Sequence, residues 1–442
     1  MNNLTNARLL KRLLANILLM FMCIGIAALT SGCASNPTIN PDYLITMKDP
    51  VSSQPKSIFV FLDGTANDES SATNVWRLFD KLKQYKNKQT FGRYIEGVGS
   101  VKEPDWPIPI VGDALGLGMQ PRILEGYDFI AQKYKPGDEI FIFGFSRGAH
   151  EARALAGLIA YAGVPKVTGN NDKCIEKRIL KIVQGTRDKD YTDKWKAWKP
   201  NQAPLLANEI KKDINVEMQA AEIKFLGVWD TVPGSAFKDY ENKDNPKQHP
   251  CKENIGCLKK YFHWIPGIIK GERYKSGSYP PIRHIAHAVA SDEKRSKFAP
   301  LLLCPPIENS TPQTLDEKWF PGAHADVGGG YDNCNKLPAI SLNWMIDLLA
   351  KNYSFNTNIE NVKVPADLLD VAHWSYGDEP GNIGSDCKDR GDLQPQLKDT
   401  PDPSIEKRKL AGSVPGGVPI KIKGVVDRQN WKYPIQCPGP GK

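Results

Sequence analysis

The chain has 442 residues, of which 40% are hydrophobic and 24% are charged, so it is long enough to bury a large core and is not a disordered protein. The net charge of +8 is small for this length, and the sequence contains no block of lysines and arginines interleaved with aromatic residues. Nucleic acid is therefore excluded as a partner.

The first 32 residues are typical of a secretory signal. A positively charged start precedes an almost unbroken apolar run over residues 13–29, and small residues lead to Cys33. The run Leu-Thr-Ser-Gly-Cys that ends at Cys33 resembles a bacterial lipobox. The resemblance implies that Cys33 is lipidated and, because residue 34 is not Asp, that the protein is anchored in the cell envelope at the outer membrane. A transmembrane anchor is the alternative, since the run is nearly long enough to span a bilayer.

Residues 33–55 are polar and interrupted by prolines, which predicts a tether between the lipid and a fold that begins at Lys56. After Cys33, seven cysteines remain, enough for at most three disulfides in an oxidising compartment. Cys251 and Cys257 have the spacing of a short closed loop and not that of a zinc ribbon.

Strands and helices alternate between residues 56 and 350. Continuous apolar runs predict buried strands, and a spacing of three to four residues predicts helices. The predicted strands cover residues 58–62, 93–98, 139–143 and 223–228, and the predicted helices begin at Thr73 or cover residues 120–134, 147–161 and 282–289. This alternation predicts a mostly parallel sheet with helices on both faces.

Two segments interrupt the alternation, and a third follows it. Residues 164–220 are rich in lysine and residues 235–280 contain several aromatic side chains, which predicts insertions over the sheet edge that form a lid or a substrate wall. Proline, aspartate and glycine dominate residues 351–442, so we expect a loop-rich C-terminal extension, tied down by Cys387 and Cys437.

The segment Gly144-Phe145-Ser146-Arg147-Gly148 matches the pattern G-x-S-x-G between a predicted strand and a predicted helix. This setting predicts a nucleophile elbow, in which Gly144 and Gly148 permit a tight turn and Ser146 is the nucleophile. The amide of Arg147 then lies at a helix N-terminus, where it can stabilise an oxyanion. A glycine-rich turn with a structural role is the alternative.

A serine nucleophile requires a base and an acid that orients the base, and in α/β hydrolases the acid precedes the histidine in the chain. Asp230 ends a predicted strand and is the expected acid, with an Asx turn or a helix cap as the alternative. His324 lies in a glycine-rich loop and is the expected base. His284 and His287 are weaker candidates, because they lie on the predicted helix over residues 282–289.

Together these segments resemble the α/β-hydrolase domain of type VI secretion phospholipase effectors. The resemblance covers about residues 56–350, and the motifs that carry it occur in the order FLDGT, GFSRGA, GVWDTV, HAVASDEKR and PGAHADVGGGY. It implies an α/β-hydrolase fold, a triad of Ser146, Asp230 and His324, and glycerophospholipid substrates. We expect neither a cofactor nor a metal ion.

The chain departs from the lipase pattern, because it has no His-Gly-Gly-Gly oxyanion segment and because fewer strands precede the elbow than in standard α/β hydrolases. Gly64 and Thr65, after the first strand, are predicted to supply the second amide donor, and Asp63 is predicted to hold this loop by accepting backbone N–H bonds.

The sequence thus predicts a phospholipase or a lipase/esterase that acts on a membrane lipid or another acyl ester through an acyl-enzyme. A non-catalytic envelope lipoprotein on a hydrolase fold and a serine peptidase with the same triad are the alternatives. The sequence does not identify a protein partner.

Overall fold

The computed structural model describes residues 40–46, 55–84, 89–99, 119–166, 175–186, 189–232, 277–295, 298–331, 336–353, 363–367, 372–373, 390, 400–411, 413–414 and 431–432. The strands of its central sheet are β1 (Leu44–Ile45), β2 (Ser57–Leu62), β3 (Thr90–Ile95), β4 (Glu139–Phe145), β7 (Ile223–Trp229), β8 (His284–Ala290), β9 (Thr314–Phe320) and β10 (Thr400–Pro401).

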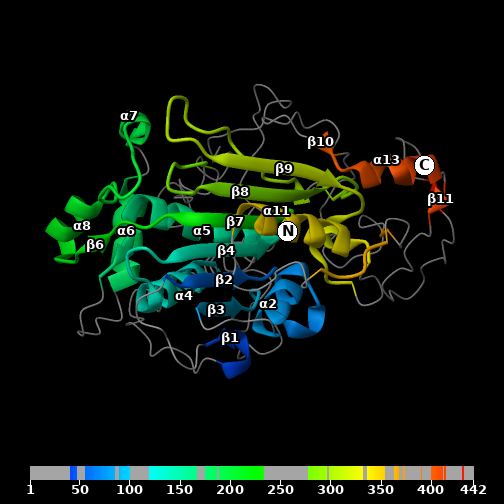
Figure 1. Ribbon diagram of the computed structural model, residues 1–442, viewed down its shortest axis with the longest axis horizontal. Coiled ribbons are helices and arrows are strands. Elements are labelled where there is room, and N and C mark those ends of the chain that lie inside the picture. The colour runs from blue at the N-terminus through cyan, green and yellow to red at the C-terminus, as the bar shows by residue number, and fades with distance from the viewer. Residues whose placement is uncertain are drawn as a thin grey trace, which may run out of the picture.

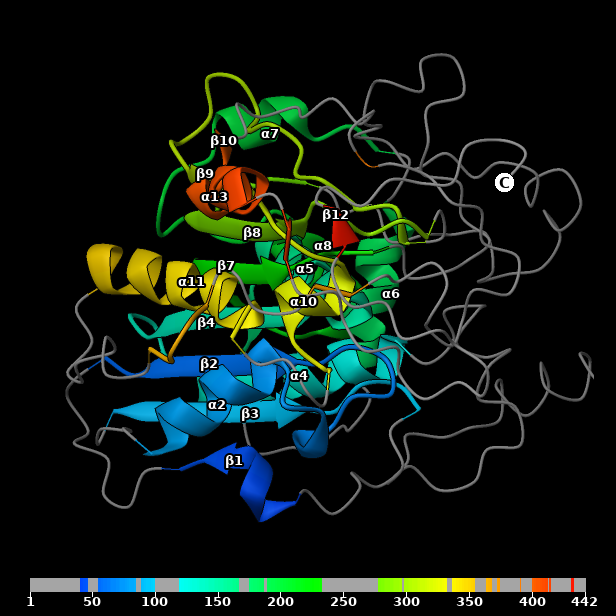
Figure 2. The same cartoon turned by 90° about the vertical axis from the view of Figure 1, so that its right-hand side faces the viewer.

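This eight-stranded sheet has the order β1-β3-β2-β4-β7-β8-β9-β10. All pairs of neighbouring strands are parallel except the β1–β3 pair at one edge, which is antiparallel. Figure 2 shows the strands stacked from β1 at the bottom to β9 near the top. The sheet is therefore mostly parallel, as predicted.

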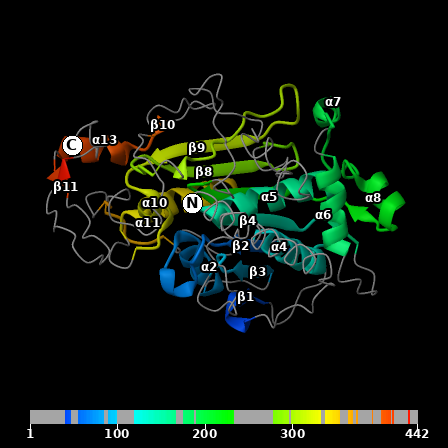
Figure 3. The same ribbon diagram turned by 180° about the vertical axis from the view of Figure 1, so that it is seen from behind.

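Helices cover both faces of the sheet. The main covering helices are α2 (Asn74–Gln84), α4 (Met119–Lys133), α5 (Arg147–Ala162) and α11 (Pro338–Asn352). Because side chains alternate along a strand, Ile58 and Val60 of β2 enter the core formed with α4 and α5, whereas Phe59 and Phe61 enter the core formed with α2 and α11. Figures 1 and 3 show these two faces. The chain has the α/β-hydrolase fold that was predicted.

The strand register brings the ends of β4 and β7 together. Phe145 at the end of β4 pairs with Trp229 at the end of β7. Directly after them, the amide of Ser146 donates to the Trp229 carbonyl at 3.0 Å. Ser146 and Asp230 therefore leave the sheet side by side at its carboxyl edge, where ligands bind in sheets of this kind.

The prediction of a helix over residues 282–289 was wrong, because His284–Ala290 forms strand β8. Every residue of β8 is buried, and the strand lies between β7 and β9. A short apolar run that is buried on both faces has the same pattern as a buried helix segment. Pairing with the neighbouring strands decides between them here.

The prediction that residues 33–55 are only a tether was wrong where the structure describes them. The 3-10 helix η1 (Pro41–Tyr43) and strand β1 extend the sheet beyond β3, and Tyr43 and Ile45 are buried. Gly92 on β3 leaves the space that Ile45 fills, since a Cβ at Gly92 would lie 2.7 Å from Ile45 Cδ1. The signal segment and Cys33 lie outside the described residues. None of the described helices has the length and apolar character needed to cross a membrane.

The first insertion lies at the opposite end of the sheet from the carboxyl edge. It contains α6 (Ile175–Gly185), α7 (Thr192–Lys196), α8 (Ala207–Ile214) and the hairpin of β5 (Val164–Pro165) with β6 (Met218–Gln219). Figure 3 shows α6, α7 and α8 at one end and α10 (His324–Gly328) at the other. The prediction that residues 164–220 form a lid or substrate wall was therefore wrong. Residues 235–276 of the second insertion lie outside the described residues.

The C-terminal extension continues the sheet. Strand β10 pairs in parallel with β9, α13 (Pro403–Ala411) follows, and β11 (Ser413–Val414) pairs with β12 (Trp431–Lys432). The prediction of a loop-rich extension missed these elements. Cys387 and Cys437 lie outside the described residues, whereas Cys304 is described and is disulfide-bonded.

Gly148 allows α5 to start against the end of β2. A Cβ at this position would lie 2.2 Å from the Leu62 carbonyl oxygen and 2.4 Å from that of Asp63, so backbone would have to move. We predict that Gly148→Ala lowers the free energy of unfolding by about 1–3 kcal/mol, the usual cost of overpacking, as measured by chemical denaturation. Gly185→Ala is the matched control, because nothing lies within 4 Å of that Cβ. A Gly148→Ala protein as stable as the control would contradict this packing.

Candidate active site

Three predicted residues meet at the carboxyl edge of the sheet. His324 Nε2 lies 2.7 Å from Ser146 Oγ, and His324 Nδ1 lies 2.6 Å from Asp230 Oδ2. A carboxylate at Nδ1 holds the ring proton there, so Nε2 is left to accept the hydroxyl proton of Ser146. The structure thus brings Ser146, His324 and Asp230 together in the order that a nucleophile, a base and an orienting acid require.

Ser146 has a strained backbone at the turn between β4 and α5. Its φ of 59° and ψ of −124° are uncommon for a residue with a side chain. Gly144 and Gly148 permit this turn, since a Cβ at Gly144 would lie 2.4 Å from the Gly148 carbonyl oxygen. The turn lifts the serine side chain above the sheet, in the manner of a nucleophile elbow.

Asp230 is fully buried, and both of its carboxylate oxygens have donors. Besides His324 Nδ1, the donors are the amide of Ala290 at 2.9 Å and the two Nη atoms of Arg390 at 2.6 and 3.1 Å. Burial by itself raises the pKa of the Asp230 carboxyl, but the Arg390 guanidinium and His324 outweigh it and hold the pKa well below its usual range. Asp230 is therefore ionised at neutral pH.

His324 is held between two aromatic rings. Its ring centroid lies 4.7 Å from that of Phe145 and 5.1 Å from that of Phe298. Burial lowers the pKa of the imidazole below its ordinary value, although the hydrogen bond to Asp230 acts in the opposite direction. The imidazole is therefore neutral at neutral pH, as a general base must be.

Three carboxylates fix the backbone around His324. Asp292 accepts the amide of Gly322 at 2.6 Å, Asp326 accepts that of Ala323 at 2.9 Å, and Glu293 accepts that of His324 at 3.2 Å. Burial opposes the charge on Glu293, but its ion pair with Arg295 outweighs burial and lowers the carboxyl pKa to about 2. The Glu293 carboxylate that accepts the His324 amide therefore stays ionised at neutral pH.

The C-terminal extension contributes side chains that the sequence analysis missed. Arg390 binds Asp230, as described above, and His373 Nδ1 lies 2.7 Å from Asp326 Oδ1. Asp326 thus meets His373 and not His324. Both contacts join residues far apart in the chain, and a single arginine or histidine in a segment rich in proline and glycine carries no pattern that reveals them.

The predicted oxyanion region is present with one correction. The Gly64 amide donates to its neighbour Asp63 at 2.7 Å, so it is already occupied and the prediction of Gly64 as a donor was wrong. Within the described chain, the amide of Thr65 has no protein acceptor. The amide of Arg147 belongs to the first turn of α5, where helix amides point beyond the N-terminus. The amides of Thr65 and Arg147 are therefore better placed to donate to an oxyanion than the amide of Gly64.

Asp63 anchors this loop, as predicted. It accepts the Gly64 amide, the Thr73 hydroxyl at 2.6 Å and the Tyr94 hydroxyl at 2.7 Å. Burial raises the pKa of its carboxyl to about 6, although these hydrogen bonds oppose the shift. The backbone at Gly64 is held close to the nucleophile, since a Cβ there would lie 3.1 Å from Ser146 Cβ.

The two weaker histidine candidates have other partners. His284 Nε2 lies 2.7 Å from Asp316 Oδ2, and His287 Nδ1 lies 2.8 Å from Glu317 Oε2. His287 Nε2 accepts the Thr231 amide at 3.1 Å, so both of its ring nitrogens are engaged. Burial, aided by the nearby Arg153, lowers the pKa of His287 to about 3. Neither histidine faces Ser146.

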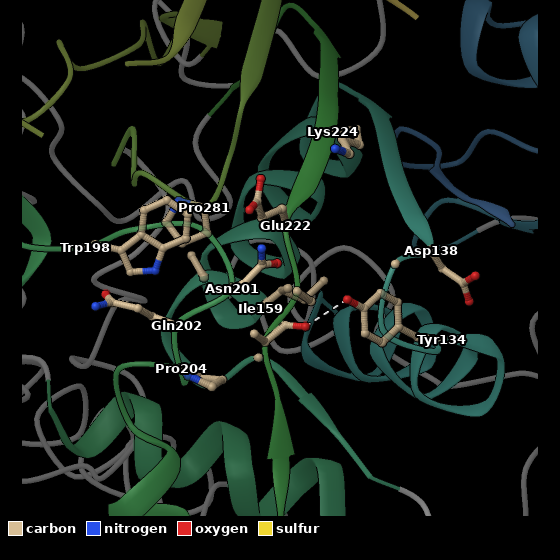
Figure 4. Close-up of a pocket in the computed structure, with 15 residues that line it drawn as sticks. Tyr134, Asp138, Ile159, Trp198, Asn201, Gln202, Pro204, Glu222, Lys224 and Pro281 are labelled. Atoms are coloured by element: carbon tan, nitrogen blue, oxygen red, sulfur yellow. Dashed lines mark hydrogen bonds between the residues drawn. The ribbon is translucent and has the colours of Figure 1, made fainter. Parts of the chain in front are cut away.

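A pocket lies at the other end of the sheet. Its lining includes Asp138, Trp198 and Glu222, and the Tyr134 hydroxyl donates to the Ala220 carbonyl beside it (Figure 4). Asp138 precedes β4 and Ser146 follows it, so a strand of seven residues, roughly 20 Å long, separates this pocket from the nucleophile.

Among the described residues, one group of carboxylates is close enough together to hold a metal ion, namely Asp68, Glu69 and Glu96. The Tyr43 hydroxyl lies between Glu69 and Glu96 and hydrogen bonds to them. This cluster is separate from the triad.

Comparisons with known proteins place the described site in a family. Residues 56–348 match the family model of the T6SS phospholipase effector Tle1-like catalytic domain. An uncharacterised protein of Saccharomyces cerevisiae is 23% identical over an alignment of 353 positions, which covers 75% of this chain and 43% of that protein.

Solved structures give more distant matches. A structure of an uncharacterised protein from Pseudomonas aeruginosa is 18% identical, with 71% of this chain and 49% of that chain covered and a TM-score of 0.34. The Tle1 effector bound to the VgrG spike of the type VI secretion system is 18% identical, with 63% and 51% covered and a TM-score of 0.27. Esterase 2 of Thermogutta terrifontis is 10% identical, with 70% and 88% covered and a TM-score of 0.35.

The chain spans about half or less of the length of the yeast protein, the Pseudomonas aeruginosa protein and the Tle1 effector. The family match, however, covers well over half of this chain and includes Ser146, Asp230 and His324. The chain therefore belongs to the family of Tle1-like phospholipase effectors of the type VI secretion system, with residues 56–348 corresponding to its catalytic domain.

Proposed function

We propose that this protein is a serine ester hydrolase that cleaves an acyl ester of a glycerophospholipid. One observation carries the proposal: the continuous hydrogen-bond chain from Ser146 Oγ through the His324 ring to Asp230. A non-catalytic protein on this fold has no need of a strained serine next to a neutral, buried imidazole. Membership of a phospholipase effector family supports the substrate class.

In the first half of the reaction, Ser146 Oγ attacks the ester carbonyl carbon while His324 Nε2 takes the hydroxyl proton. The charged oxygen of the tetrahedral intermediate accepts hydrogen bonds from the amides of Arg147 and Thr65. Asp230 stabilises the imidazolium that forms. When the intermediate collapses, His324 returns its proton to the leaving lysolipid alcohol, and the acyl group stays on Ser146.

In the second half, a water molecule replaces the alcohol. His324 Nε2 takes a proton from this water as it attacks the acyl-enzyme carbonyl, and a second tetrahedral intermediate forms at the same amides. Its collapse releases the fatty acid and returns the proton to Ser146 Oγ. The arrangement also suits a peptide bond chemically, so the choice of substrate has to be tested directly.

We predict that Ser146→Ala and His324→Ala each lower kcat for ester hydrolysis by roughly 10⁴-fold or more, because each removes one member of a unit. The double variant is expected to be little worse than either single variant. Hydrolysis of short-chain p-nitrophenyl esters, phosphatidylcholine vesicles and a casein substrate is measured in parallel. Full activity of a folded Ser146→Ala protein, or cleavage of casein alone, would overturn the proposal.

The pH dependence follows from the pKa of the base. Because burial lowers the pKa of His324 below its ordinary value of 6.5, the catalytically competent neutral form persists as the pH falls through 6.5. We predict that the acidic limb of kcat/KM for an uncharged ester has its midpoint below pH 6.5. A midpoint at or above that value would show that a different group, or a more exposed one, is the base.

We further propose that the protein is a lipoprotein anchored in the cell envelope through Cys33, on the strength of the lipobox resemblance. Anchoring would place the hydrolase beside its lipid substrate. The location of the anchor at the outer membrane belongs to the same proposal.

We predict that Cys33→Ser abolishes incorporation of alkyne palmitate in cells and leaves the signal segment uncleaved. Cys23→Ser is the matched control, since Cys23 lies inside the apolar run and is removed with it. Labelling is detected by click chemistry on the purified protein. Absence of label on the wild-type protein would favour the transmembrane anchor instead.

A further inference from the structure

Arg390 reaches the catalytic acid from outside the segment that matches the family. The matched segment ends at residue 348, whereas Arg390 lies in the C-terminal extension. Its Nη1 and Nη2 donate to Oδ1 and Oδ2 of Asp230 at 2.6 and 3.1 Å, so the guanidinium meets the carboxylate with two parallel bonds. Pairs of this geometry are the strongest and most directional that arginine makes.

The same guanidinium is fixed in place by the backbone. Nη1 also donates to the Ala290 carbonyl at 2.7 Å, and Nη2 donates to the Phe298 carbonyl. Arg390 is only 4% exposed, and its side chain therefore has one position in which all of these acceptors are reached. Ala290 in turn donates its amide to Asp230 Oδ1. The end of β8, the extension and the acid form one closed network.

We propose that Arg390 is a positioning residue that aims the Asp230 carboxylate at His324. The inference rests on the proposed serine-hydrolase function, to which it adds a fourth side chain supplied by the C-terminal extension. Oδ1 accepts from the Ala290 amide and from Arg390 Nη1, whereas Oδ2 accepts from Arg390 Nη2 and has its other lone pair directed at His324 Nδ1. Rotation of the carboxylate would break both arginine bonds at once, so the acid keeps its orientation during turnover.

The charge of Arg390 also sets the proton affinity of the pair that it holds. The titratable and charged groups packed around Asp230 and His324 are Arg390, Glu293, Arg295, His287 and Arg153. Removal of the Arg390 cation leaves the Asp230 charge uncompensated, which favours protonation of the Asp230–His324 pair. The pKa of the base then rises, and the acidic limb of activity moves to higher pH.

The test compares wild type, Arg390→Met and Arg390→Lys on p-nitrophenyl butyrate, with a fluorophosphonate probe used to count competent active sites. Arg390→Met is expected to lower kcat by roughly 10- to 100-fold with little change in KM, and to shift the acidic limb upward. Arg390→Lys keeps the positive charge but cannot form the two parallel hydrogen bonds to the carboxylate. The acidic limb of its pH profile is therefore expected at the wild-type pH, whereas its kcat is expected to stay reduced.

Arg93→Met is the matched control. Arg93 is also buried and pairs with a carboxylate, that of Glu125. It lies on β3, which β2 separates from β4 and the nucleophile. The Arg93→Met protein is expected to lose stability without any change in kcat per competent site or in the limb. If the Arg390→Met protein has the wild-type kcat per competent active site and the wild-type midpoint of the acidic limb, Arg390 has only a structural role and the inference is overturned. If Arg390→Met does not fold, wild-type kcat in Arg390→Lys has the same consequence. A wild-type protein without esterase activity, or an active Ser146→Ala protein, would instead refute the proposed function itself.

Discussion

The Asp230 carboxylate at the edge of the sheet has no exposed surface, and the burial of its charge governs what surrounds it. An ionised group without solvent is costly unless every lone pair is satisfied and an opposite charge lies close by. Asp230 meets this requirement with donors from β8, from the histidine loop and from the extension. These three segments converge on one point because the carboxylate needs all of them.

Much of this arrangement was predictable from local patterns. The strands that lead to Ser146 and Asp230 are continuous apolar runs. The spacing of Gly144 and Gly148 around the serine indicates a nucleophile elbow when a strand precedes it and a helix follows. The histidine was identified by chain order and by its glycine-rich loop. These features depend on residues close together in the sequence, which is why periodicity and motif reveal them.

The remaining features depend on contacts between distant segments. His284–Ala290 is a strand because it fits between β7 and β9, and its composition alone does not distinguish it from a helix. Arg390 lies 160 positions from its partner, in a segment without regular pattern. The occupied amide of Gly64 follows from the rotamer of Asp63, which the sequence does not specify. Pairing of this kind is a tertiary property, and single residues carry no trace of it.

The place of Arg390 late in the chain has a consequence for the order of synthesis. A polypeptide that has emerged only as far as α11 already contains Ser146, Asp230 and His324, but the cation that the acid requires has yet to be made. On the role inferred for Arg390, a nascent chain beside the membranes of its own cell carries an assembled nucleophile with a poorly aimed acid. The proposed hydrolase activity then reaches its full level only after the extension has docked, so synthesis of the triad precedes full activity.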